Sequence, residues 1–127
     1  MPLSNDLITQ WASQQGLNPH EAGAPGRLSI NLDRVRLHLV ALDAERVLLE
    51  TRVLDLPLAA HERERALEQA LRLATARLRD GAATLAAHED GQSLWLQATL
   101  PAEAGSAALT ELAEQVCNEA DLWRGAL

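Results

Sequence analysis

The spacing of apolar residues changes along this chain from the period of a helix to that of a strand and back, and this restricts the folds open to it. Over residues 4–15, apolar side chains recur every three or four positions, which predicts an amphipathic helix ending before Gly16. Its apolar residues are Leu3, Leu7, Ile8 and Trp11. Residues 17–26 contain two prolines and two glycines, which predicts a loop.

From Arg27 the spacing becomes two, which is typical of strands with one buried face. A meander of three antiparallel strands is predicted, followed after a helix by a hairpin of two more. The strands are expected at residues 27–32, 35–41, 47–53, 84–88 and 92–100, with turns at 33–34, 43–45 and 89–91. Gly91 favours the last turn because glycine readily adopts positive φ. The side chains expected to face inward are Leu28, Ile30, Leu37, Leu39, Val47, Leu49, Leu94 and Leu96.

Helical spacing returns after Pro57, over residues 60–79, and again over residues 107–124. The apolar stripe of the first segment is Leu67, Ala70, Leu71, Ala74 and Leu78, and that of the second is Leu109, Leu112, Val116, Ala120 and Trp123. The element order α-β-β-β-α-β-β-α predicts an α+β fold with an antiparallel sheet flanked by helices. With 127 residues, the chain is expected to form a single domain over residues 1–127.

Composition excludes several classes of partner. Eleven arginines against eighteen acidic residues give a net charge of −7, which disfavours nucleic acid and anionic membranes. No window approaches the roughly 20 apolar residues that a membrane-spanning helix needs, so membrane insertion is not expected. One cysteine and no recognisable signal segment at the N-terminus are typical of a protein that stays in the cytoplasm.

Residues with catalytic or metal-binding chemistry are few and scattered. The run that begins at His61 has no second histidine four residues on, as a zinc-binding helix would have. His88-Glu89-Asp90 coincides with a predicted turn, and Cys117 has no histidine near it in sequence. No glycine-rich loop opens a helix to bind phosphate. We therefore expect no catalytic residues, no metal and no cofactor, and the chain is not expected to be an enzyme.

The sequence predicts more apolar surface than one side of the sheet can bury. Val40, Leu42, Leu48, Leu54 and Trp95 are expected on the opposite, outward side. Large exposed apolar patches usually mark interaction sites. The cover could be the helix over residues 60–79 of the same chain, a second subunit, or a bound client polypeptide.

The pattern resembles that of the class I type III secretion chaperones, a family of small acidic bacterial proteins with the same order of elements. The resemblance spans the chain and rests on the first helix with Leu7, Ile8 and Trp11, the meander that ends before Pro57, and the closing segment with Trp123-Arg124. The sequence departs from the family's commoner pattern because the helix over residues 60–79 lacks a Leu-x-x-Asn ending and the closing helix has no phenylalanine.

The resemblance implies a homodimeric chaperone that binds an extended N-terminal segment of a type III effector and keeps it soluble and competent for export. The implied client-binding residues are Leu7, Trp11, Val40, Leu42, Leu48 and Trp95. The implied dimer interface contains Leu67, Leu71, Ala74, Leu78 and Leu85. Two alternatives remain open, a structural adaptor of a secretion apparatus and a small-ligand-binding or enzymatic α+β protein.

Overall fold

The computed structural model describes residues 3–17, 26–32, 34–77, 81 and 83–126, and contains the elements predicted from the sequence in the same order. In chain order these are α1 (Ser4–Gln14), β1 (Arg27–Leu32), β2 (Val35–Ala41), β3 (Arg46–Asp55), α2 (Ala60–Arg77), β4 (Thr84–Ala87), β5 (Ser93–Pro101), the short 3-10 helix η1 (Ala102–Ala104) and α3 (Gly105–Ala126). The α+β fold class is confirmed. Residues 18–25 of the predicted loop, the turn residue Asp33 and residues 78–79 at the expected end of α2 lie outside the described residues.

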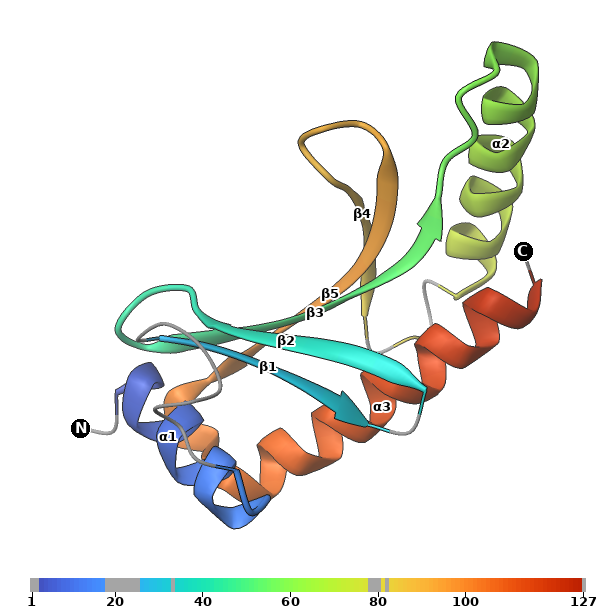
Figure 1. The fold of residues 1–127 in the computed structure, drawn as a ribbon. Coiled ribbons are helices and arrows are strands. Elements are labelled where there is room, and N and C mark those ends of the chain that lie inside the picture. Colours follow the sequence, from blue (N-terminus) through green and yellow to red (C-terminus); the bar gives the residue numbers. More distant parts are fainter. Residues whose placement is uncertain (1–2, 18–25, 33, 78–80, 82, 127) are drawn as a thin grey trace.

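The five strands form one antiparallel sheet in the order β1-β2-β3-β5-β4. Helix α2 connects β3 to the far edge of the sheet, and β5 then returns to pair with β3. Helices α1 and α3 lie together against one side of the sheet (Figure 1). The eight leucine, isoleucine and valine side chains predicted to face inward are all at most 6% exposed, so that prediction is confirmed.

Helix α1 is held in the core by its whole apolar face. Leu7 and Trp11 are 3% and 1% exposed, and Trp11 Nε1 donates a hydrogen bond to Thr110 Oγ1 of α3 at 3.0 Å. At the start of the helix, the Ser4 amide and hydroxyl donate to the backbone carbonyls of Ala44 and Asp43. The expectation that Leu7 and Trp11 stand on an open client-binding surface is therefore wrong, because packing against the sheet and α3 already buries them.

Helix α2 packs beside the C-terminal half of α3 rather than over the outward face of the sheet (Figure 1). Ala70 is buried, and Ala66, Leu67, Leu73 and Ala74 are partly buried against a cluster that includes Cys117, Ala120 and Trp123. Val40, Leu48 and Trp95 belong to neither of the two core clusters. The alternative in which this helix covers the outward face is therefore wrong.

A buried ion pair fixes the end of α2. Arg77 donates from Nε to Glu119 Oε1 at 3.0 Å and from its terminal nitrogen to Oε2 at 2.6 Å, and the Glu119 side chain is only 5% exposed. Gly81 lies directly against this pair, since a Cβ at that position would come within 2.9 Å of both the Arg77 carbonyl oxygen and Glu119 Oε1. Glycine is therefore needed here because the chain passes close to the ion pair.

The pairing of β3 with β5 contains an irregularity. The register shifts between Arg52 and Leu54, after which Leu54 pairs with Leu94. As a result both Val53 and Leu54 contact the core cluster beside α2, so the expectation that Leu54 faces outward is wrong. At the position of the shift, the backbone carbonyl of Arg52 accepts a hydrogen bond from one terminal nitrogen of Arg124 at 2.9 Å. The other terminal nitrogen of Arg124 donates to the backbone carbonyl of Arg34 at 3.0 Å.

Candidate functional site: the outward face of the sheet

The outward face is the side of the sheet opposite α1 and α3, and the strand register sets its side chains in rows. One row is apolar in the middle, with Val40 opposite Leu48 and Leu48 opposite Thr99. Val40 and Leu48 are both half-buried side chains. Both residues were expected on the outward side, and the register makes them direct neighbours that form the apolar centre of the face.

A polar row crosses the sheet next to the apolar pair. His38 lies opposite Glu50, and Glu50 lies opposite Gln97. Gln97 Nε2 donates to Glu50 Oε2 at 3.0 Å, and His38 Nδ1 lies 2.7 Å from Ser29 Oγ. Burial and then the nearby Arg36 charge lower the pKa of His38, against the opposing effect of Glu50. His38 is therefore neutral at pH 7, and this row consists mainly of neutral hydrogen-bonding groups around one carboxylate.

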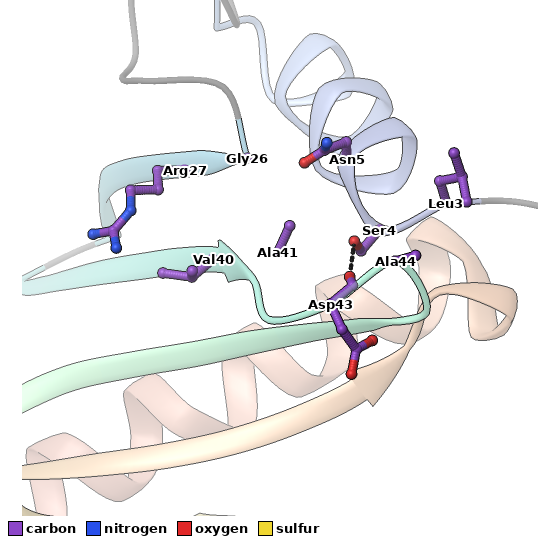
Figure 2. A pocket seen from close by; sticks show the side chains of 9 residues that line it. All are labelled: Leu3, Ser4, Asn5, Gly26, Arg27, Val40, Ala41, Asp43 and Ala44. Atoms are coloured by element: carbon purple, nitrogen blue, oxygen red, sulfur yellow. Dashed lines mark hydrogen bonds between the residues drawn. The ribbon is translucent and has the colours of Figure 1, made fainter.

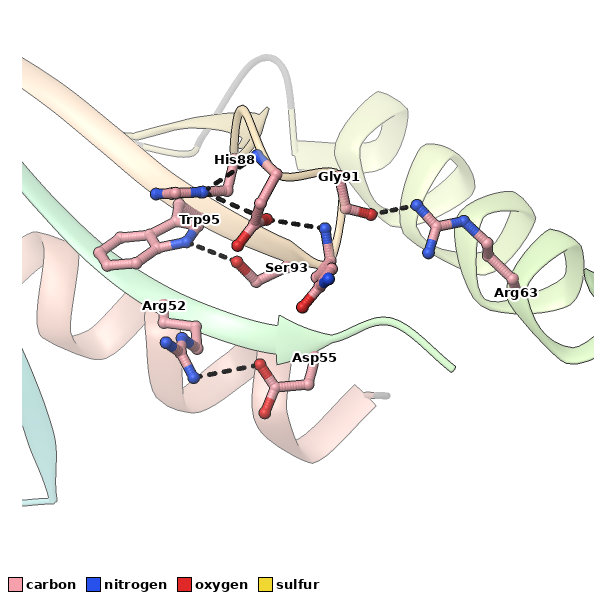
Figure 3. Close-up of polar contacts among 9 residues, drawn as sticks. Arg52, Asp55, Arg63, His88, Gly91, Ser93 and Trp95 are labelled. Carbon is pink, nitrogen blue, oxygen red and sulfur yellow. Dashed lines mark hydrogen bonds and ion pairs between the residues drawn. The ribbon is translucent and has the colours of Figure 1, made fainter. Parts of the chain in front are cut away.

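Trp95 forms an aromatic cluster on the same face (Figure 3). Its ring lies 5.5 Å from the His38 ring and 5.7 Å from the His88 ring, measured between centroids. The Arg52 guanidinium lies 5.8 Å from the centroid of the indole, and Trp95 Nε1 donates to Ser93 Oγ at 2.9 Å. These contacts hold the half-buried indole in place, so its exposed part is a preformed apolar surface.

The predicted client-binding residues thus separate into three groups. Val40 and Leu48 are cross-strand neighbours, and Leu42 lies just beyond β2 with 46% of its surface exposed. Trp95 shares their face but lies two rows away, beyond Glu50 and Gln97. Leu7 and Trp11 are buried on the opposite side. Alternation along β3 places Glu50 outward together with Leu48, but only the strand register shows that His38 and Gln97 join Glu50 in one polar row.

A pocket of about 470 Å³ lies between the start of α1 and the adjoining ends of β1 and β2 (Figure 2). Its lining residues are Leu3, Ser4, Asn5, Gly26, Arg27, Val40, Ala41, Asp43 and Ala44. Asp43 accepts hydrogen bonds from the backbone amide of Glu45 and from the amide and Nε of Arg46, which lower the pKa of its carboxyl group. Because Val40 lines both the pocket and the outward face, the two surfaces are continuous.

The residues of the expected dimer interface have different surroundings. Leu71 is 65% exposed on α2, whereas Leu67 and Ala74 are half-buried against the core of their own chain. Leu85 on the edge strand β4 is opposite the buried Leu96 and packs toward the same core. Leu78 lies outside the described residues. The apolar surface that α2 leaves exposed therefore consists of Leu71 and the exposed parts of Leu67 and Ala74.

Neither a metal-binding cluster nor a membrane-spanning helix is present among the described residues. Within the described part of the chain, no group of three or more histidine, cysteine, aspartate or glutamate side chains is placed to hold a metal ion. Asp90 accepts a hydrogen bond from the Gln92 amide at 2.8 Å, which lowers its pKa, and His88 Nδ1 lies 3.2 Å from Asp90 Oδ1, as in the predicted turn. None of the described helices has the length and apolar character needed to cross a membrane.

Comparison with known proteins identifies the family. The sequence model of the Tir chaperone protein (CesT) family matches residues 6–124. The chain belongs to the Tir chaperone protein (CesT) family. No curated protein sequence matches it significantly. The resemblance noted from the sequence is thereby confirmed.

Solved structures similar to this CesT-family chain include two that are described as belonging to type III secretion. In the heterodimeric ExoU–SpcU complex of Pseudomonas aeruginosa, the matching chain is 19% identical, with a TM-score of 0.70 over 94% of this chain and 97% of that chain. The HopA1–SchA chaperone–effector complex gives 18% identity and a TM-score of 0.67, over 94% and 91%. The Yersinia pestis type III secretion chaperone SycH, in complex with a fragment of YscM2, gives 16% and 0.64, over 94% and 98%. These matches confirm the fold over nearly the whole chain.

Proposed function

We propose that this chain is a type III secretion chaperone that binds an extended N-terminal segment of an effector in the cytoplasm and keeps it soluble and competent for export. Membership of a chaperone family supports this function, as do structural relatives described as chaperone–effector complexes. This function requires only binding and no covalent chemistry, so we propose no enzymatic activity. The net charge of −7 would help to keep the complex soluble.

The observation that carries this proposal is the uncovered outward face of the sheet. Both α1 and α3 pack against the inward side, and α2 packs beside α3, so the described helices leave Val40 and Leu48 partly exposed. An extended client could place apolar side chains over this pair and over Trp95. The open edges of β1 and β4 offer backbone groups for pairing with such a segment.

We propose that the chaperone acts as a homodimer. The exposed Leu71, near the centre of a helix whose leucines Leu67 and Leu73 are only partly buried, supports an interface on α2. A symmetric two-fold contact is the commonest arrangement for assemblies of identical chains. Because α2 lies away from the outward face, this interface would leave that face free for the client.

Leu48→Glu should abolish co-purification with the N-terminal region of the effector encoded in the same locus. A charge in the apolar centre of the face removes an anchor, and truncating such an anchor commonly costs about 2 kcal/mol or more of binding free energy. The measurement is co-expression followed by affinity capture, with circular dichroism to check folding. Trp95→Ala should have the same effect.

Leu122→Glu is the matched control. Leu122 is 41% exposed on α3, the helix that covers the opposite side of the sheet, so the same substitution there should leave capture unchanged. If the Leu48→Glu variant folds and still retains the effector at full affinity, the outward face is not the client surface.

A further inference from the structure

The outward face differs in charge from the chain as a whole. The chain carries a net charge of −7. Among the outward-facing strand residues that the structure describes, however, there are four arginines and two acidic residues, namely Arg27, Arg36, Arg46, Arg52, Glu50 and Asp55. An acidic protein thus presents a locally basic surface on the side that its helices leave open.

Two of these arginines already have carboxylate partners on the same chain. Arg46 lies 2.8 Å from Asp43 Oδ2, and Arg52 lies 3.2 Å from Asp55 Oδ1. Each pair lies at one end of β3 and is exposed. These two guanidinium groups are therefore largely balanced before any client binds.

Arg27 and Arg36 differ from this pattern. Within the described residues, neither has a carboxylate oxygen within 4.0 Å, and the hydrogen bond of Arg36 is to the neutral Asn31 Oδ1 at 3.3 Å. Arg27 is opposite Val40 in the strand register and lies beside it in Figure 2. Arg36 is four residues before Val40 on β2, two rows from the apolar centre and beyond His38, so only Arg27 borders the apolar centre directly.

Glu50 does not offset these two charges. Glu50 accepts a hydrogen bond from Gln97 at 3.0 Å. It lies opposite His38 on β3, which is two strands away from β1 in the sheet. An extended segment laid over Val40 and Leu48 and across the His38 row would bring Arg27 and Arg36 into a drier environment without a counter-charge from the described part of the chain. A segment with carboxylates beside its apolar residues would provide one.

We infer that the client segment on the outward face is acidic, with one carboxylate side chain beside the apolar residues that cover Val40 and Leu48, where it pairs with Arg27, and another beyond the His38 row, where it pairs with Arg36. This inference rests on the proposed chaperone function and specifies the chemistry of its client. The charges give selectivity and speed of encounter, and the apolar pair gives most of the affinity. Because the arginines are exposed in the free protein, added salt should weaken this selectivity.

Three labelled synthetic peptides test the inference. They share one extended sequence with leucine at alternate positions and differ only in the intervening charged positions, which are glutamate, glutamine or lysine. Dissociation constants are measured by fluorescence anisotropy at low and high sodium chloride. The glutamate peptide should bind about tenfold more tightly than the lysine peptide, the size expected of two partly exposed ion pairs, and the difference should shrink at high salt.

Substitutions locate the effect. The double variant Arg27→Gln with Arg36→Gln should lose most of the preference for the glutamate peptide. The control is the double variant Arg65→Gln with Arg72→Gln, at two exposed positions of α2. It makes the same change in net charge and should keep the preference. Equal binding of the three peptides, tighter binding of the lysine peptide, or an unchanged preference in the Arg27 and Arg36 variant overturns the inference.

A further variant separates this result from a failure of the proposed function. If Leu48→Glu weakens all three peptides while they bind equally to the original chain, the outward face still binds apolar segments and only the acidic client is wrong. If none of the peptides binds, the inference and the proposed binding surface both fail.

Discussion

Arg77→Ala is expected to lower the free energy of unfolding by about 3 kcal/mol or more, because it leaves the carboxylate of Glu119 buried without its partner. Glu119 is 5% exposed and receives both hydrogen bonds of the Arg77 fork, at 3.0 and 2.6 Å. The pair joins the end of α2 to α3, so its loss should also loosen the helix. Urea unfolding followed by circular dichroism measures the change at one fixed protein concentration.

The double variant Arg77→Met with Glu119→Leu is the control for this prediction. Replacing a buried ion pair by apolar residues of similar size is often neutral or stabilising, so the double variant should recover most of the loss. An Arg77→Ala variant with the urea midpoint of the original chain would show that the pair contributes little to stability.

Leu71→Asp should convert a dimer into single chains or make the protein insoluble. Leu71 is 65% exposed in the isolated chain, and burying an unpaired carboxylate at an interface costs several kcal/mol. Light scattering coupled to gel filtration should give twice 13.8 kDa for the original chain and 13.8 kDa for the soluble variant. Gln69→Asp, an exposed position on another side of α2, should keep the dimer mass. A Leu71→Asp variant of dimer mass would place the interface elsewhere.

The arrangement of the sheet could be predicted because each inward row follows from simple alternation. Leu37, Leu39, Val47 and Leu49 fall on one side of their strands by parity alone, and short turns leave little freedom in the pairing. Leu54 was misplaced because a register shift moves one residue without any change in the sequence period. Such irregularities depend on the partner strand and on groups such as Arg124, which come from distant parts of the chain.

The candidate site could be predicted only in part, because exposure depends on which elements pack together. Alternation placed Leu48 and Trp95 outward, but the pattern of α1 could not show that α3 would bury Trp11. The position of the end of α2 beside α3 depends in part on the ion pair between Arg77 and Glu119, which are 42 residues apart. No local pattern indicates a contact of that kind.

Acrylamide quenching of tryptophan fluorescence, with and without the effector's N-terminal region, tests most directly whether a client covers the outward face. All three tryptophans are in the described part of the chain, and Trp11 and Trp123 are each 1% exposed, so the quenchable signal comes from the half-buried Trp95. The account predicts that adding a client region free of tryptophan lowers the quenching constant toward that of buried indoles. A complex that forms by gel filtration and leaves the quenching constant unchanged would contradict it.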